Sequence, residues 1–218
     1  MQRVLVLVEG QTEERFIKDV LCPHFWEIKI DVIPTIVVTK RVKSGPDFKG
    51  GITDYQKVVN DLTRLLSDTS AAAITTFIDY YGLPSDFPGM TSRPPGHPID
   101  CVGHVETEWR SEIADIRFHP YLMTHEFEAL LFSKPEEISL ALNDPMALSQ
   151  LQQVCSSFST PEDINDDPQT APSKRILSIS PRYQKTVQGS MVAQRIGLQL
   201  IREQCTHFNE WLGWLESL

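Results

Sequence analysis

Hydrophobic and polar positions fall into alternating blocks along the first part of the chain. Runs of apolar and β-branched residues occupy 4–8, 32–38 and 71–78, and such runs are typical of strands buried on both faces of a parallel sheet. The chain turns helical at Thr12, and residues 52–67 place their apolar side chains on one face of a helix. The order strand, helix, strand, helix, strand predicts an α/β fold with right-handed crossovers.

The pattern becomes less regular after the third strand. Residues 80–98 are rich in Gly and Pro and predict a long loop, which in a compact domain is usually functional or mobile. A helix over 99–114, a fourth strand over 116–123 and a helix over 126–132 are expected to follow.

Beyond about residue 134 the pattern changes to helices joined by polar connections, and residues 191–218 predict the last helical stretch. We therefore expect an α/β core over 1–133 and a mainly helical part over 134–218 packed on it, the two forming either two units or a single domain.

Composition narrows the class of protein. With 218 residues and 41% hydrophobic content, the chain can bury a core without disulfide bonds. Its four cysteines are far apart and form no CxxC pair, which argues against a zinc module and fits reduced thiols. The sequence contains no apolar run of about 18 residues and no secretory leader pattern, so a cytoplasmic protein is expected.

Charge is distributed unevenly. The net charge is −9, which argues against tight binding of nucleic acid by this chain alone. Residues 168–202 nevertheless carry six basic residues and no acid, and residues 39–49 carry four basic residues and one acid. A phosphate-contacting face is one interpretation and an ordinary polar surface is the other. The residues expected to contact nucleic acid are Lys40, Arg41, Lys43, Arg175, Arg182 and Lys185.

Acidic residues follow three of the predicted strands. Glu9 ends the first strand, Asp79 ends the third, and Glu126 and Glu128 follow the fourth. Because the carboxyl ends of parallel strands share one edge of a sheet, these acids are expected to converge, with Asp86 nearby. Clustered carboxylates repel one another unless a cation lies among them, and oxygen ligands suit Mg²⁺ or Mn²⁺. Such ions promote phosphodiester hydrolysis.

The individual roles of these acids differ. On a regular helix Glu126 and Glu128 would point to nearly opposite sides, so Glu126 is the preferred metal ligand unless the helix begins between them. Glu13 is either an outer acid supporting the site or a favourable charge at a helix N-terminus. His125 lies beside the acids and could contact a phosphate, although a structural role is the preferred interpretation. No HExxH, P-loop, GxGxxG or GxSxG motif occurs.

Five segments carry a resemblance to a known family. VEGQTE (8–13) resembles the first motif of the Toprim domain found in OLD (overcoming lysogenization defect) nucleases. Together with four further segments, it is similar to a bacterial Toprim-like family catalogued as domain of unknown function 4276. The further segments are FIDYYGLPSDFPG (77–89), HEFEALLF (125–132), APSKRI (171–176) and CTHFNEWL (205–212).

The resemblance implies a Rossmann-like Toprim core with Glu9 as general acid/base or metal ligand and Asp79 as metal ligand. It also implies a distal catalytic lysine, for which Lys174 within APSKRI is preferred over Lys185; a solvated helix start is the alternative for Lys174. Toprim domains usually carry Asp-x-Asp at the third strand, whereas this chain has Asp79-Tyr80-Tyr81. Asp86 or Glu126 would have to replace the second acid.

Three functions remain open at this point. The leading hypothesis is a Mg²⁺- or Mn²⁺-dependent nuclease subunit acting on nucleic acid, with DNA favoured over RNA. The resemblance further implies a separate ATPase subunit of the ABC/AAA kind in a phage-defence type of system. The second hypothesis is a non-catalytic module that regulates such an ATPase, and the third is a receiver-like phosphoryl-transfer protein. The sequence leaves the oligomeric state open.

Overall fold

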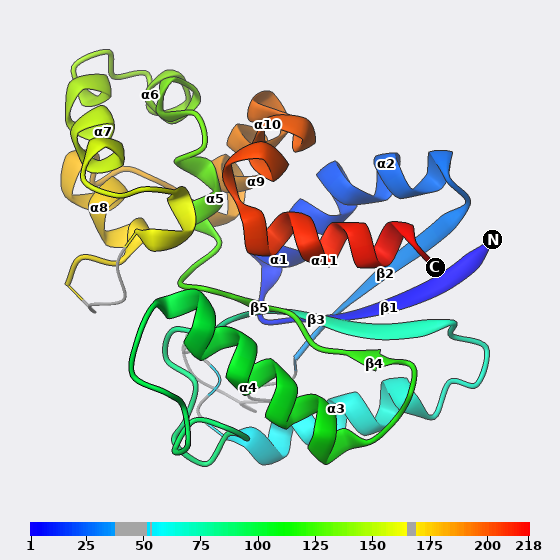
Figure 1. Cartoon of the computed structure of the whole chain (residues 1–218). Helices are drawn as coiled ribbons and strands as arrows, with labels where there is room; N and C mark the ends of the chain where they lie inside the picture. Colours follow the sequence, from blue (N-terminus) through cyan, green and yellow to red (C-terminus); the bar gives the residue numbers. More distant parts are fainter. Residues whose placement is uncertain (38–51, 53, 165–168) are drawn as a thin grey trace, which may run out of the picture.

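A parallel sheet forms the middle layer of the computed structural model, which describes residues 1–37, 52, 54–164 and 169–218 (Figure 1). Strand β1 (Gln2–Val8) lies between β2 (Ile30–Ile36) and β3 (Ala73–Asp79), and β4 (Phe118–His119) and β5 (Leu122–Met123) both pair with β3. Every one of these pairings is parallel. The α/β fold with a parallel-sheet core, expected from the sequence, is confirmed.

The fourth strand is interrupted, which differs from the continuous strand predicted over 116–123. The Thr76 hydroxyl donates to the Tyr121 carbonyl oxygen at 2.7 Å and accepts from the Tyr121 amide at 3.0 Å. The Thr76 side chain therefore bonds the backbone groups of Tyr121 that would otherwise pair with the neighbouring strand. Pro120, directly before Tyr121, has no N–H to donate, so the chain pairs with β3 only before and after this point.

The two faces of the sheet bury separate hydrophobic clusters. Side chains of β1 alternate between them, because successive residues of a strand point to opposite faces. Val4, Val6 and Val8 belong to the larger cluster, and Leu5 and Leu7 belong to the smaller one. Residues 4–8 of the central strand are therefore buried on both faces, as their apolar run predicts.

Helices α3 (Tyr55–Leu66) and α4 (Pro98–Ile113) cover the face of the smaller cluster (Figure 1). Both agree with the helices predicted over 52–67 and 99–114. The segment between β3 and α4 contains turns only, as expected from its Gly and Pro content.

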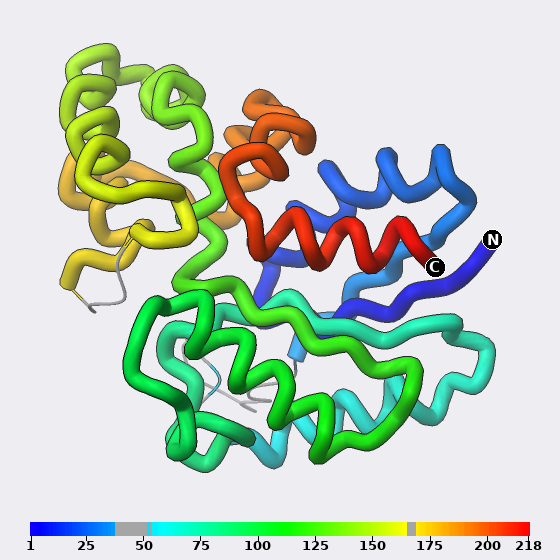
Figure 2. The backbone as a smooth tube through the Cα atoms, viewed as in Figure 1, coloured from blue at the N-terminus to red at the C-terminus, as the bar shows by residue number. Residues whose placement is uncertain are grey.

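The other face is covered by helices from both ends of the chain (Figure 2). α1 (Gln11–Phe16) continues through a π-helical turn, η1 (Ile17–Leu21), into α2 (Cys22–Glu27). These elements share one hydrophobic cluster with α9 (Lys185–Ile196) and α11 (Thr206–Glu216). The two parts expected from the sequence therefore contribute to the same core. The remaining elements are α5 (Glu128–Leu131), α6 (Pro135–Leu142), α7 (Ala147–Ser156), η2 (Pro161–Asp163), α8 (Pro172–Ile179) and α10 (Leu198–Gln204).

The last helical stretch, predicted as continuous over 191–218, is divided into three helices. Gly197 separates α9 from α10 with a φ of 83°, a left-handed backbone conformation that glycine adopts without a steric penalty. The backbone is extended at Cys205 before α11 begins. Helix α11 then packs on the sheet, where Trp211 Nε1 donates a hydrogen bond to Thr75 Oγ1 at 2.9 Å.

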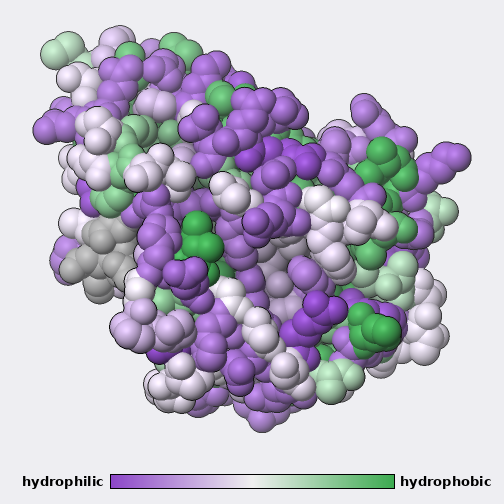
Figure 3. Space-filling view, in the orientation of Figure 1, coloured by the Kyte–Doolittle hydropathy of each residue, from purple (hydrophilic) through white to green (hydrophobic). Residues whose placement is uncertain are grey.

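The surface seen in Figure 3 is mostly hydrophilic, with hydrophobic side chains in small separate groups. Within the described ranges, none of the helices combines the length and the apolar character that crossing a membrane requires.

Candidate functional site

The ends of the two central strands bring Glu9 and Asp79 together. Glu9 follows β1 directly, and Asp79 is the last residue of β3. The Asp79 amide donates a hydrogen bond to Glu9 Oε2 at 3.3 Å. Adjacent parallel strands place their carboxyl ends side by side, which is why residues so far apart in the sequence meet here.

Helix α1 adds a third carboxylate. Glu13 lies in the first turn of α1 and is buried. Gly10 stands between β1 and α1, and a Cβ atom there would lie 3.2 Å from Glu13 Oε2. The absence of a side chain at residue 10 therefore leaves room for the Glu13 carboxylate beside the strand end.

Glu126 and Glu128 both reach this edge of the sheet. Helix α5 begins at Glu128. The helix therefore starts between the two acids, which is the condition under which both can point to the site. Glu126 Oε2 accepts a hydrogen bond from the Ser173 amide at 2.8 Å, in the first turn of α8. Glu128 is fully buried, and its Oε1 atom accepts a hydrogen bond from the Tyr183 hydroxyl at 3.4 Å.

Lys185 is the cation that the structure places among these acids. Its Nζ atom lies 2.9 Å from Glu128 Oε2. Its charge also acts on Glu9, Glu13 and Asp79. The sequence favoured a different lysine, Lys174, which is exposed in the first turn of α8.

The electrostatics of the site are dominated by burial. Desolvation, reinforced by the Glu13 charge, raises the pKa of Glu9 to about 7. Desolvation raises the pKa of Glu128 to about 7 against the opposing effect of Lys185. The pKa of Asp79 is raised well above its usual range by burial and by the neighbouring Glu9 charge. Burial disfavours the charged form of each acid, and like charges add to the effect.

The chemistry of the donor atoms fits a hard divalent cation. The donors are carboxylate oxygens, which Mg²⁺ and Mn²⁺ prefer. The buried Asp79 Oδ1 atom has no hydrogen-bond partner among the described residues, although such atoms are normally paired. The described side chains nevertheless include no group of three or more His, Cys, Asp or Glu residues already gathered to hold an ion. The ligand types are present, but they are not assembled into a finished metal site.

The two remaining acidic or histidine candidates lie in different surroundings. Asp86 is exposed in the loop after β3. His125 is buried beside Glu126.

The basic candidates are spread over several environments. Arg175 donates to the Thr170 carbonyl oxygen at 2.6 Å, and its guanidinium lies 5.2 Å from the centre of the Phe158 ring. Arg182 is exposed after α8. Three further candidates, Lys40, Arg41 and Lys43, lie outside the described residues.

Sequence analysis did not identify Tyr183 and Gly189 as parts of the site. Gly189 lies in α9 one turn after Lys185, and a Cβ atom there would lie 3.0 Å from Phe127 Cε1 and 3.3 Å from the Tyr183 hydroxyl. A glycine inside a predicted helix is a signal for close packing, but it does not reveal which element packs against it.

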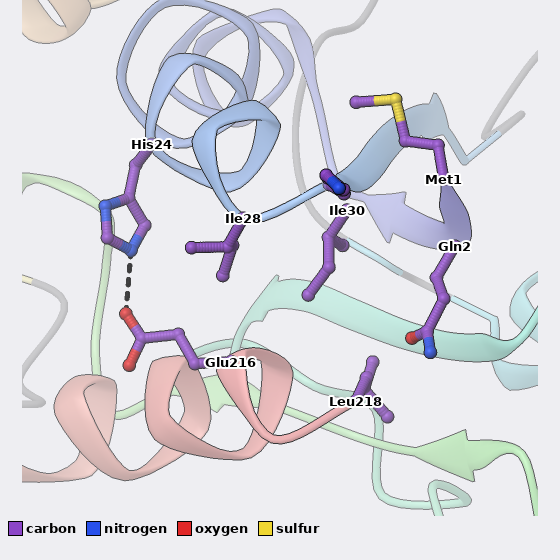
Figure 4. A pocket seen from close by; sticks show the side chains of 8 residues that line it. Met1, Gln2, His24, Ile28, Ile30, Glu216 and Leu218 are labelled. Atoms are coloured by element: carbon purple, nitrogen blue, oxygen red, sulfur yellow. Dashed lines mark hydrogen bonds and ion pairs between the residues drawn. The ribbon is translucent and has the colours of Figure 1, made fainter.

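A cavity of about 400 Å³ lies at the other end of the sheet (Figure 4). It is lined by residues at the start of β1 and β2 and by α11, and it contains the contact between His24 Nε2 and Glu216 Oε1 at 2.7 Å. It is therefore separate from the acids at the carboxyl ends of the strands.

Fold and site together define a parallel α/β domain with an acidic edge. The chain belongs to the family described as Domain of unknown function (DUF4276), which matches residues 8–216. This match confirms the resemblance to domain of unknown function 4276 that the sequence motifs indicated.

Solved structures give a more distant likeness. The C-terminal region of the Burkholderia pseudomallei OLD protein is similar with 15% identity and a TM-score of 0.43, covering 96% of this chain and 98% of that chain. The C-terminal region of the Xanthomonas campestris pv. campestris OLD protein is similar with 16% identity and a TM-score of 0.42, covering 100% and 99%. The comparison with curated protein sequences gives no match.

Proposed function

We propose that this chain is a Mg²⁺- or Mn²⁺-dependent nuclease subunit that hydrolyses phosphodiesters of nucleic acid at the carboxyl edge of its sheet. The observation that carries the proposal is the convergence of carboxylates from β1, α1, β3 and the 126–128 segment around one lysine ammonium group. Such a concentration of buried negative charge is costly unless the site serves a cation.

The acids at the ends of the two strands supply the reactive groups in this proposal. A bound divalent cation would contribute Lewis-acid chemistry by neutralising charge on the phosphate. Glu9, Asp79, Glu126 and Glu128 would supply its oxygen ligands. Because burial raises the pKa of Glu9 to about 7, this carboxylate can also accept a proton from water, or return one, near neutral pH.

Basic residues around the acids would hold the nucleic-acid backbone without reading its sequence. Lys174 and Arg182 are exposed on or beside α8, whose N-terminus is bound to Glu126. They are therefore suited to phosphate contacts close to the acids. DNA is the favoured substrate.

A separate ATPase subunit of the ABC/AAA kind, in a phage-defence type of system, completes the proposal. The net charge of −9 opposes association of this chain with nucleic acid. A partner that binds nucleic acid would remove this difficulty. This part of the proposal rests on the motif resemblance and on the charge, and co-purification with a neighbouring ATPase tests it.

A non-catalytic module is the second candidate. Two observations favour it. The third strand ends at Asp79 and is followed by Tyr80 and Tyr81, without a second acid, and the described residues contain no assembled three-ligand site. In that case the chain would regulate an ATPase without cleaving nucleic acid.

Cleavage of supercoiled plasmid separates the two candidates. Wild-type protein is compared with Glu9→Gln and Asp79→Asn in Mn²⁺, in Mg²⁺ and in chelator, with the exposed Glu27→Gln as control. Metal-dependent cleavage that is lost in both site variants and retained in the control supports the nuclease. Clean wild-type protein that neither cleaves plasmid nor binds metal supports the regulatory module.

A further inference from the structure

Lys185 reaches the acids from the surface and has a fully buried partner. Its side chain is 37% exposed, whereas the Glu128 side chain that it contacts at 2.9 Å is 0% exposed. Five carboxylates act on this one ammonium group, from Glu9, Glu13, Asp79, Glu126 and Glu128. Lys185 therefore compensates part of the charge that a divalent cation would neutralise.

The packing of α9 fixes this arrangement. Gly189 allows α9 to approach Phe127 and Tyr183 closely. The Arg15 guanidinium donates to the Thr186 carbonyl oxygen at 3.0 Å, and the Ser190 hydroxyl donates to Asp19 Oδ2 at 2.8 Å. These contacts join the first turns of α9 to α1 and η1. They fix the start of α9, and therefore Lys185, beside the acids.

Compensation by Lys185 is incomplete. Its ammonium group contacts Glu128, but Asp79 Oδ1 is left buried without a hydrogen-bond partner among the described residues. An ammonium group carries one charge and directional N–H donors, whereas a divalent cation could contact several of these oxygens at once.

We propose that Lys185 is the built-in counter-ion of this carboxylate site, and that a divalent cation binds by displacing its ammonium group from the acids. This inference rests on the proposed function, because it concerns the same metal site. The counter-ion role explains why suitable metal ligands are present although the described acids are not arranged as a three-ligand metal site. The affinity for the metal then depends on competition between Lys185 and the cation for the same carboxylates, as well as on the ligands.

The first experiment measures Mn²⁺ binding by electron paramagnetic resonance of the free ion, without nucleic acid. Lys185→Met is compared with wild type and with Lys134→Met. Lys134 is a matched control because its side chain is 40% exposed and its Nζ atom lies 3.0 Å from Glu137. We expect Lys185→Met to bind Mn²⁺ about tenfold more tightly than wild type, within the usual range of coupling between two sites, and Lys134→Met to match wild type.

The melting temperature provides a second readout. Without metal, Lys185→Met is expected to melt below wild type because the buried acids lose their counter-charge, and saturating Mn²⁺ is expected to raise its melting temperature by more than that of wild type. Equal or weaker Mn²⁺ binding by a folded Lys185→Met protein overturns the counter-ion role. If neither protein binds Mn²⁺, the proposed metal-dependent function fails as well. If wild type cleaves nucleic acid but Lys185→Met binds Mn²⁺ with unchanged affinity, only the counter-ion inference is overturned.

Lysine labelling of the wild-type protein keeps the test independent of any variant. Amine acetylation followed by mass spectrometry is expected to modify Lys185 more slowly than Lys134 without metal, and to accelerate at Lys185 when Mn²⁺ is added. Unchanged or slower labelling of Lys185 in saturating Mn²⁺ contradicts its displacement.

Discussion

The Asp79 amide donates a hydrogen bond to the Glu9 carboxylate across 3.3 Å, which ties together the ends of the two central strands at the acidic edge. The bond lowers the pKa of Glu9, but burial and the Glu13 charge outweigh it, and the resulting pKa is about 7. Glu9 therefore carries a charge at neutral pH that the fold only partly accommodates.

Replacing Glu9 by Gln is expected to stabilise the metal-free protein at pH 7.5. The amide keeps an acceptor for the Asp79 amide and removes a desolvated charge, so the free energy of unfolding should rise by roughly 1–2 kcal/mol. Urea denaturation in chelator measures the change, with the exposed Glu27→Gln as control. A destabilised Glu9→Gln protein would show that the carboxylate supports the metal-free fold.

The stability of the metal-free protein is expected to fall as pH rises from about 4.5 to about 7 because of Glu9 and Glu128. Both have a folded-state pKa of about 7, above the ordinary value of 4.5. The folded state therefore binds more protons in this window, and its advantage is lost as pH rises through the folded pKa.

The double variant Glu9→Gln, Glu128→Gln isolates this contribution from the titration of other groups. Urea denaturation of wild type and of the double variant is compared across the pH window in chelator. The difference in the free energy of unfolding between the two proteins should change by several kcal/mol across this window, because two folded-state pKa values lie well above the ordinary value. A difference that does not vary with pH would contradict the raised pKa values.

Substitution of Glu126 is expected to affect α8. Glu126 Oε2 accepts the hydrogen bond of the Ser173 amide at 2.8 Å, and an acceptor in the first turn of a helix contributes about 1 kcal/mol. Glu126→Ala should increase hydrogen exchange over residues 171–179, whereas Glu126→Gln keeps an acceptor and should increase it less. Equal exchange in the two variants would show that this contact does not hold the helix.

A methyl group at Gly189 is expected to destabilise the protein by roughly 1–3 kcal/mol, the usual cost of overpacking a core. The added Cβ would lie 3.0 Å from Phe127 Cε1. Gly213 in α11 is the matched control, since a Cβ there meets no atom within 4 Å. Gly213→Ala should be stabilising by up to about 1 kcal/mol through helix propensity. Urea denaturation of both variants checks the contrast.

The strands and the convergence of the acids were accessible from the sequence because both depend on simple periodicity. An apolar run such as 4–8 marks a buried strand, and parallel strands place Glu9 and Asp79 at the same edge. The start of α5 was harder to predict, because one residue decides whether Glu126 and Glu128 diverge. Helix ends are set by local hydrogen bonds that the pattern does not resolve.

Lysine placement required the tertiary structure. Lys174 lies within a recognisable motif but is exposed, whereas Lys185 contacts the buried Glu128. The difference depends on how α8 packs against α5 and how α9 packs against α1, and sequence spacing carries no information about that packing. The break of the last helical stretch at Gly197 likewise depends on a positive φ of 83°, which the hydrophobic pattern does not reveal.

The contact between Lys185 and Glu128 also has a consequence for folding. Glu9 and Asp79 follow strands of the first half of the chain, whereas their counter-charge arrives with α9, so the site closes only through contacts of long sequence separation. Such contacts are slow to form. A refolding chain is therefore expected to regain its helical signal before the proposed Mn²⁺ response, and metal titration during refolding would then report complete assembly of the site.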